Sequence, residues 1–207
     1  YCEGNFGKVD GKTANGLIRH SQAYRIVSVI DSSHNRQDSG QILDDVINNI
    51  PIFGNLKAAV VHERKVPDTF IYGMAPSTGK LSSQDRILIL DAIAMGMNIV
   101  SGLHEYLSED SEIAAFASKH DVTIRDIRKP KQSKDMRLFD GSIKNVDAVR
   151  IAVLGTDCAI GKRTTATVLA RALNAKGIKT VLVGTGQTGL MQGAKYGVAM
   201  DAVPPQF

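Results

Sequence analysis

The sequence lacks several features that mark specialised classes of protein. It holds only two cysteines, Cys2 and Cys158, which cannot form a disulfide framework. Its most apolar stretch, residues 87–100, includes Asp91 and is shorter than the ~20 residues that a membrane-spanning helix needs. No segment has the pattern of a signal peptide. We therefore expect a cytoplasmic protein that does not enter a membrane, and Cys158, inside the loop described below, suits a reducing compartment.

The charged residues also argue against some partners. The net charge of +4 is mildly basic, but no run of lysine and arginine alternates with aromatic residues, so nothing favours nucleic-acid binding. The basic tract at residues 125–137 has the composition of a solvated linker. The five histidines show no metal-ligand spacing, and we predict no metal site.

The strongest motif lies at residues 149–165, VRIAVLGTDCAIGKRTT. The β-branched run 149–154 predicts a buried strand, and helical spacing of apolar residues predicts a helix over 162–176. A glycine-bounded loop between a strand and a helix is typical of a phosphate-binding P-loop, although a plain strand-to-helix turn is the alternative. The predicted phosphate-binding residues are Gly155, Thr156, Asp157, Cys158, Ala159, Ile160, Gly161, Lys162, Arg163 and Thr164.

The spacing of this loop departs from the usual P-loop. Five residues separate Gly155 from Gly161, and Thr156 stands where the first glycine normally lies. Arg163 occupies the position that normally offers a hydroxyl to Mg²⁺, and Thr164 follows it. Because a guanidinium cannot bind a cation, we expect a ligand rich in phosphate and poor in metal.

The rest of the chain alternates between strand and helix patterns, which predicts an α/β protein with a parallel sheet covered by helices. A basic, proline-containing stretch divides it. We predict a first domain at 1–127, a linker at 128–147, and the start of a P-loop domain, which we expect to be incomplete, at 148–207. Helices are predicted at 12–22, 41–49, 82–96 and 109–120, strands at 25–30, 69–74, 98–101, 122–126 and 180–183, and a helix or a short strand at 56–61.

Ligands of open parallel sheets bind where the carboxyl ends of the strands meet the following loops. Lys12 begins the helix after a glycine-punctuated loop, and Asp31 ends the second strand, where a dinucleotide-binding acid would lie. Ser77 and Thr78 suit an anion site or a simple turn, and His104 suits a general base or a helix cap. We predict that Lys12, Asp31, Ser77 and Thr78 contact substrate.

Two further residues belong to the C-terminal segment. Gln187 is the main polar side chain of a second glycine-rich loop, Gly184 to Gly189, which we expect to lie beside the P-loop and to help bind the cofactor; a flexible turn is the alternative. Asp201 is a ligand carboxylate or a cap.

Four stretches together resemble a family of unknown function that joins a Rossmann-like N-terminal domain to a P-loop domain similar to dethiobiotin synthetase. They are GKTANGL (11–17), SGLH (101–104), GTDCAIGKRTT (155–165), and TGQTG (185–189) with DAV (201–203). Some members are D-glutamate N-acetyltransferases. The members closest to that description carry Met after the P-loop lysine, and Arg163 departs from them.

The resemblance implies acetyl transfer from acetyl-CoA to a D-amino acid. We also expect a homo-oligomer. The P-loop would bind phosphates of CoA, and His104 and Asp201 would be the catalytic residues beside the amino acid. The alternatives are an ATP-dependent ligase or kinase of the dethiobiotin-synthetase type, with Mg²⁺ near Asp157, and a non-catalytic regulatory module that senses a nucleotide through Asp31 and the P-loop.

Overall fold

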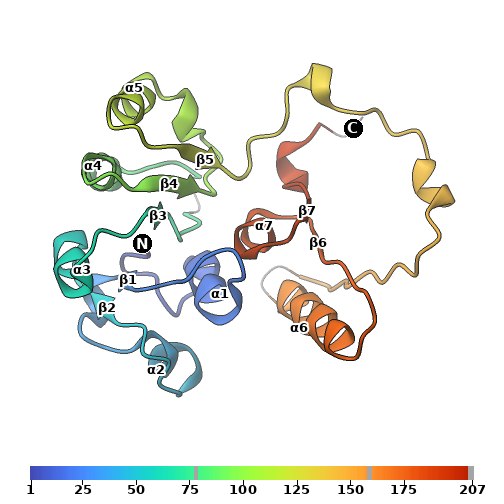
Figure 1. Cartoon of the computed structure of the whole chain (residues 1–207), viewed down its shortest axis with the longest axis horizontal. Helices are drawn as coiled ribbons and strands as arrows, with labels where there is room; N and C mark the ends of the chain where they lie inside the picture. The colour runs from blue at the N-terminus through green and yellow to red at the C-terminus, as the bar shows by residue number, and fades with distance from the viewer. Residues whose placement is uncertain (77–78, 158–159, 205–207) are drawn as a thin grey trace.

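The computed structural model describes residues 1–76, 79–157 and 160–204, and it has an α/β architecture (Figure 1). The α-helices are α1 (Lys12–His20), α2 (Ser39–Asp44), α3 (Leu56–Glu63), α4 (Ser83–Ala94), α5 (Ser111–Lys119), α6 (Lys162–Ala175) and α7 (Gln187–Gln192). The strands are β1 (Val29–Ile30), β2 (Ile52–Phe53), β3 (Thr69–Ile71), β4 (Asn98–Ser101), β5 (Ile124–Asp126), β6 (Val183–Gly184) and β7 (Tyr196–Gly197).

All the paired strands run parallel, as the strand–helix alternation predicts. The strands form a pair β1-β2, a three-stranded sheet β3-β4-β5 and a pair β6-β7. The expectation of an α/β fold with parallel sheets is therefore confirmed. No helix in the described ranges has the length and apolar character needed to cross a membrane.

Side-chain caps set where several helices begin. The Ser82 hydroxyl accepts the Asp85 N–H at the start of α4, and the Asp110 carboxylate accepts two N–H groups at the start of α5. Gly161 precedes α6 with φ +94°, a left-handed conformation that favours glycine. The predicted helix after the P-loop is thus confirmed.

The hydrophobic core belongs almost entirely to the N-terminal region, residues 1–127. Its cluster runs from Cys2 to Ala117 and packs the strands of this region against its helices. The segment at 128–147, which the sequence predicts to be a linker, is mostly exposed, and Figure 1 shows it as a yellow arc that loops away from both regions. Within it the chain forms two short 3-10 turns, Ser133–Asp135 and Ser142–Asn145.

The prediction of a buried strand at 149–154 is wrong. These residues form no strand, and Val149 and Leu154 are 92% and 84% exposed. A parallel strand needs hydrogen-bonded neighbours, but among the described residues β6 pairs only with β7. The β-branched pattern is therefore present without the sheet that would bury it.

The helix predicted at 41–49 is also misplaced, because α2 ends at Asp44. Asp45 adopts φ +54°, and Val46 and Ile47 are exposed by 65% and 66%. The Asp38 carboxylate accepts N–H groups of Gly40 and Gln41, and also that of Asn48. These local side chain–backbone bonds fold the chain back and compete with the helix.

Candidate functional site

The P-loop closes on itself at the start of α6. The Lys162 ammonium donates to the backbone carbonyl of Asp157. A Cβ on Gly155 would lie 2.5 Å from Ile160 Cδ1 and 3.0 Å from Lys162 Cδ, so this glycine allows the close approach. Cys158 and Ala159 lie outside the described residues. The lysine head and the N-terminus of α6 thus lie at one small loop, which suits an anion.

Arg163 turns toward α1. Its guanidinium packs on Gly16, where a Cβ would lie 2.4 Å from Nη1. Burial lowers the pKa of Arg163, and the nearby charge of Arg19 lowers it further. The Nη1 atom is buried without a hydrogen-bond partner among the described residues. Lys162 therefore faces the loop, whereas the Arg163 guanidinium lies between α6 and α1. Thr164 is half-buried.

The segment expected as a second glycine-rich loop is a helix from Gln187 onward, so that prediction is wrong in its second half. The helix α7 packs on α1: the hydroxyls of Thr188 and Thr13 lie 2.9 Å apart, and the Gln22 N–H donates to the Gln192 carbonyl at 2.7 Å. The side-chain amide of Gln192 donates to the carbonyl of Gly16. These bonds join two segments that are far apart in the sequence.

Gln187 contacts the loop that follows β4, and Asp201 is linked to that loop through Arg128. A Cβ on Gly102 would lie 3.0 Å from Gln187 Cγ, so the two are in close contact. The Gly102 carbonyl accepts Nε of Arg128 at 2.7 Å, and Nη1 of Arg128 pairs with the Asp201 carboxylate. Arg128 is only 8% exposed, whereas the Asp201 side chain is 50% exposed.

Sequence reasoning missed Arg128, because it follows β5 at the first residue of the predicted linker and resembles the solvated charges after it. Only its position just beyond a strand end signals a role. The structure uses the Asp201 carboxylate as its ion-pair partner, which anchors the C-terminal segment to the Gly102 loop.

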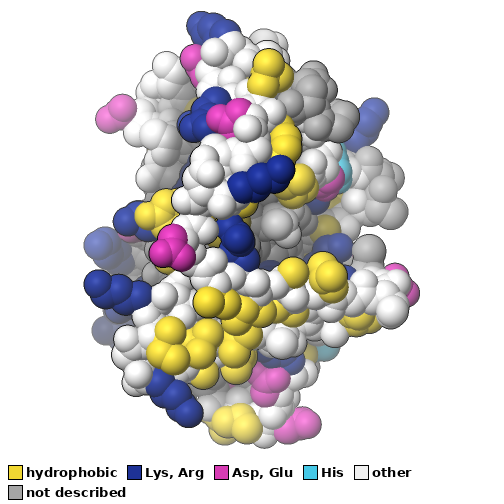
Figure 2. Space-filling view, turned by 90° about the vertical axis from the view of Figure 1, so that its right-hand side faces the viewer, with side chains coloured by type: hydrophobic (Ala, Val, Ile, Leu, Met, Phe, Trp, Pro, Cys, Tyr) yellow, Lys and Arg dark blue, Asp and Glu magenta, His cyan; other side chains and the backbone are white. Residues whose placement is uncertain are grey.

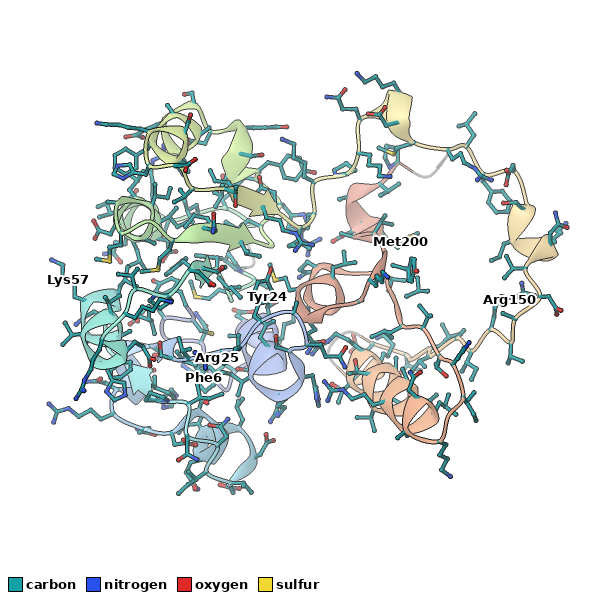
Figure 3. The ribbon with its side chains drawn as sticks, in the orientation of Figure 1. Phe6, Tyr24, Arg25, Lys57, Arg150 and Met200 are labelled. Carbon is teal, nitrogen blue, oxygen red and sulfur yellow. The ribbon has the colours of Figure 1, made fainter. Side chains whose placement is uncertain are left out.

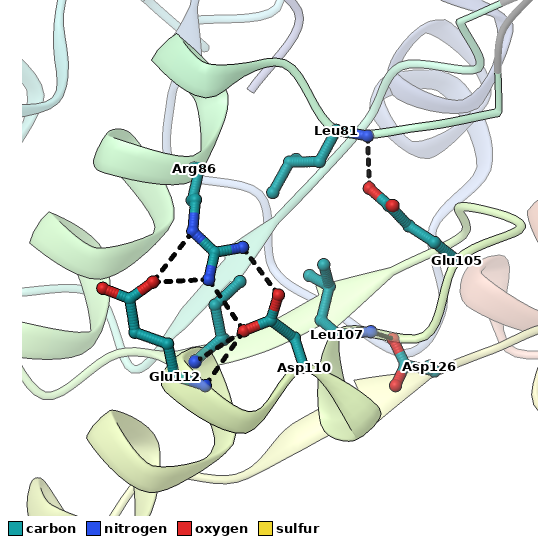
Figure 4. Close-up of polar contacts among 8 residues, drawn as sticks. Leu81, Arg86, Glu105, Leu107, Asp110, Glu112 and Asp126 are labelled. Carbon is teal, nitrogen blue, oxygen red and sulfur yellow. Dashed lines mark hydrogen bonds and ion pairs between the residues drawn. The ribbon is translucent and has the colours of Figure 1, made fainter.

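His104 lies exposed on this loop, and its ring packs on Gly79. Bonds on both sides hold the loop in place (Figure 4): the Glu105 carboxylate accepts the Leu81 N–H, and the Asp126 carboxylate accepts the Leu107 N–H at 3.0 Å. The His104 N–H itself donates to the Gly79 carbonyl at 3.2 Å. An exposed imidazole on a fixed loop can exchange a proton with a ligand. Ser77 and Thr78 lie outside the described residues.

Asp31 holds a turn together. It is completely buried, and its carboxylate accepts the N–H groups of Gly4 and Phe6, each at 3.1 Å, and that of Ser33 at 2.9 Å. Burial would raise the pKa of this carboxyl, but the bonds from Ser33, Phe6 and Gly4 outweigh it and hold the pKa below its usual value. Asp31 thus shapes the glycine loop before α1, and Lys12 is exposed where that helix begins.

The structure brings Gln187, Asp201 and the His104 loop together, and it places the P-loop beside α1. Two contacts hold α6 beside α1. Arg163 packs on Gly16, and Arg171 donates to the His20 carbonyl at 2.9 Å. Among the described residues no three His, Cys, Asp or Glu side chains gather as metal ligands. The site defines the class: a P-loop protein whose P-loop domain packs on a Rossmann-like α/β domain.

The two halves match the two domain models of one family. Residues 32–130 match the Rossmann-like domain of DUF1611, a domain of unknown function, and residues 137–207 match its P-loop domain. The chain belongs to the DUF1611 family, which confirms the resemblance seen in the sequence.

Curated relatives carry an enzyme name. The chain is 35% identical over 139 residues to a D-glutamate N-acetyltransferase of a Pseudoalteromonas species, and 34% identical over the same length to one of Tritonibacter scottomollicae. Each match covers 67% of this chain and 40% of the relative. The chain thus matches about two fifths of the length of these relatives.

A solved structure has the same fold. The crystal structure of a DUF1611 family protein from Anabaena variabilis, at 2.30 Å resolution, matches with a TM-score of 0.84 and 32% identity. The match covers 98% of this chain and 56% of the other. This chain therefore shares its fold, across both regions, with that protein.

Proposed function

We propose that this protein is an N-acetyltransferase that moves the acetyl group of acetyl-CoA to the amino group of a D-amino acid such as D-glutamate. The observation that carries this proposal is its similarity to two relatives named D-glutamate N-acetyltransferase, at 35% and 34% identity. In the reaction the amine nitrogen forms an amide bond with the acetyl carbon, the thioester C–S bond breaks, and the amine loses a proton as the thiol leaves.

The P-loop suits the phosphates of CoA. CoA carries a pyrophosphate and a separate phosphate, and an ammonium at a helix N-terminus binds such groups without a metal. Lys162 supplies the ammonium, and Gly161, with φ +94°, lets the chain turn into α6. Arg163 serves instead in the contact with α1, so Lys162 carries most of the phosphate affinity.

We assign the proton transfer to His104. Its imidazole is exposed on a loop that hydrogen bonds fix on both sides, and histidine is the side chain that most often serves as a general base. Asp201 acts indirectly: it pairs with Arg128, which holds the Gly102 carbonyl and so positions the loop. Lys12, exposed at the start of α1, suits the carboxylate of the amino acid.

The test is an acetyl-transfer assay with acetyl-CoA and matched D- and L-amino acids. Lys162→Ala is expected to raise the KM for acetyl-CoA tenfold or more at unchanged KM for the amino acid, because it removes a charged hydrogen bond of about 1.5–3 kcal/mol. His104→Gln is expected to lower kcat at least 100-fold, the lower range for a general base. Lys179→Ala, on the exposed connection after α6, is the matched control. Absence of acetylated product with every D-amino acid would refute the proposal.

An ATP-dependent ligase or kinase is the second candidate, because P-loops commonly bind nucleotide triphosphates. Calorimetric titration separates the two. Tight binding of Mg-ATP with phosphate release, and no binding of acetyl-CoA, would favour this second candidate, with the half-buried Thr164 as the residue to substitute next.

A further inference from the structure

Arg128 is the only basic side chain among the buried residues that the structure describes, and it is 8% exposed. It lies two residues beyond the end of β5, at the carboxyl edge of the parallel sheet β3-β4-β5. Ligands of open parallel sheets bind at this edge. A buried guanidinium is costly unless it is paired, so the partners of Arg128 indicate which kind of group this place can hold.

The three nitrogen atoms of this guanidinium differ in their partners. Nε donates to the Gly102 carbonyl at 2.7 Å, which orients the guanidinium against the loop that follows β4. Nη1 pairs with one carboxylate oxygen of Asp201. No hydrogen bond or ion pair joins Nη2 to a described residue, and Nη2 is not one of the fully buried atoms without a partner, so solvent reaches it. Arg128 therefore has donors to spare for a further acceptor.

The charged residues next to Arg128 in the sequence have partners of their own. The Asp126 carboxylate accepts two backbone N–H groups of the loop after β4, at 3.0 and 2.9 Å. The ammonium of Lys129 pairs with Glu109 at 3.2 Å. Asp201 is therefore the one carboxylate that is paired with Arg128 among the described residues.

The Asp201 carboxylate is a loosely held partner. Its side chain is 50% exposed, and only one of its oxygens bonds to Arg128. It stands on the short 3-10 turn Met200–Ala202, and Figure 3 labels Met200 on this segment. By contrast, Asp110 gives both of its oxygens to Arg86. A rotation of the Asp201 side chain into water would therefore free Nη1 while Nε stays bonded to the loop.

We propose that Arg128 binds the side-chain carboxylate of an acidic D-amino acid, and that Asp201 occupies this site until the substrate displaces it. This inference rests on the proposed acetyl transfer and names the class of its substrate. Arginine suits the role because its planar guanidinium binds both oxygens of a carboxylate at once. Nη1 and Nη2 would take the two oxygens, and Nε would keep its bond to the Gly102 carbonyl.

The exchange of one carboxylate for another explains why the site would select acidic side chains. A neutral side chain cannot displace Asp201, because the buried guanidinium of Arg128 would then lose its counter-charge. Lys12 is proposed for the carboxylate that every amino acid carries, so the second carboxylate of an acidic one needs a separate cation. The loop that Arg128 holds at Gly102 also carries His104, so one segment links this site to the proposed proton acceptor.

The test compares D-glutamate with D-glutamine, which has an amide in place of the side-chain carboxylate. Titration calorimetry without acetyl-CoA gives the Kd of each, and the acetyl-transfer assay gives each KM and kcat. Arg128→Gln is expected to raise the Kd and the KM for D-glutamate at least about tenfold, the size of a lost charged hydrogen bond, and those for D-glutamine less than about twofold. Asp201→Asn is expected to lower the Kd for D-glutamate at least about threefold, because an amide competes weakly for the guanidinium.

The matched control is Glu109→Gln, which removes an exposed carboxylate from the adjacent ion pair with Lys129 and should leave both Kd values unchanged. Equal losses for the two amino acids in Arg128→Gln would mean that Arg128 only holds the loop, and would overturn the inference. Weaker binding of D-glutamate by Asp201→Asn would make Asp201 a part of the site and would overturn it as well. Binding of D-glutamate that depends on Arg128, without acetylation of either amino acid, would refute the proposed transfer and retain the carboxylate site.

Discussion

The two regions differ in how many apolar side chains they bury. The N-terminal region comprises residues 1–127 and the C-terminal region residues 148–207. In the first, helices and strands share a cluster of buried apolar residues from Cys2 to Ala117. In the second, only Met191 and Ala199 among the described apolar residues are buried, while Val149, Leu154 and Val181 are more than half exposed. Figure 2 looks onto this side of the molecule and shows hydrophobic side chains gathered on its surface.

The comparison shows what anchors the C-terminal region. Its buried contacts lie on α1 and beside Gly102, and many of them are polar: the Thr13–Thr188 bond, the Gln192–Gly16 bond and the Arg128–Asp201 ion pair. Four buried polar atoms have no hydrogen-bond partner in the described ranges, and all lie on α1, α6 or α7: His20 Nε2, Arg163 Nη1, Thr167 Oγ1 and Gln192 Oε1. Because these contacts include unsatisfied groups, we expect the seam, which is the contact of α6 and α7 with α1, to open before the N-terminal core unfolds.

The largest effect is expected in the N-terminal core. Ile99→Ala removes a completely buried side chain of β4 and should cost about 2–5 kcal/mol of the free energy of unfolding. Val181→Ala, at a side chain that is 61% exposed, is the control and should cost less than about 0.5 kcal/mol. Urea denaturation followed by circular dichroism measures both. Similar costs would show that the two regions are packed alike.

A polar group in the same core comes next. Asp85 is 8% exposed and accepts the hydroxyls of Tyr1 at 2.5 Å and Tyr72 at 2.9 Å. Asp85→Ala leaves both hydroxyls unpaired and should cost about 2 kcal/mol, measured by the same denaturation experiment. Asp91→Ala, on the exposed face of the same helix α4, should change little, and an equal loss there would contradict the argument.

A smaller effect is expected at the seam. Thr188→Val removes the 2.9 Å bond to Thr13 and should lower the opening free energy of α7 by about 1 kcal/mol, which speeds amide exchange there about fivefold. Exchange in β4 should stay unchanged. The exposed Thr165 gives the control Thr165→Val. If β4 and α7 accelerate together, the two regions unfold as one unit.

The smallest effect concerns pH. The bonds from the Arg86 guanidinium, and then the Ile113 N–H, lower the pKa of Asp110 to about 2 (Figure 4). This carboxyl therefore stabilises the folded state above its unfolded pKa, near 4, and loses that contribution as the pH falls toward 2. Because both partners are nearly one third exposed, we expect less than about 1 kcal/mol. Asp110→Asn should flatten the acid limb of stability against pH; an unchanged slope would refute it.

Local signals predicted the elements that depend on local physics. The helix after Lys162 follows from apolar spacing and from Gly161, and the cap of α4 follows from Ser82. The same reasoning failed at 149–154, because burial of a strand depends on partners that no local pattern reveals. It also failed at Asp45, where hydrogen bonds from a loop to Asp38 ended the helix early.

At the candidate site, too, local features could be predicted and long-range contacts could not. The motif identified the loop around Lys162, because glycine spacing and a terminal lysine are properties of a short segment. The direction of Arg163 depends on the space that Gly16 leaves in a distant helix. The link from Asp201 to Gly102, beside Gln187, depends on Arg128, and in the sequence this arginine resembles the solvated charges that follow it.

The hydrogen bonds that the Tyr1 and Tyr72 hydroxyls donate to Asp85 have a spectroscopic consequence. The chain has no tryptophan and only five tyrosines, so its near-ultraviolet absorption and emission come from tyrosine. Burial and the neighbouring carboxylate raise the pKa of Tyr1 and of Tyr72 far above the usual value, which keeps both phenols neutral in alkali while the core is folded. Phenolate absorbance from this pair in alkali therefore marks the loss of its burial, and the molecule carries its own spectroscopic reporter of whether its N-terminal core is intact.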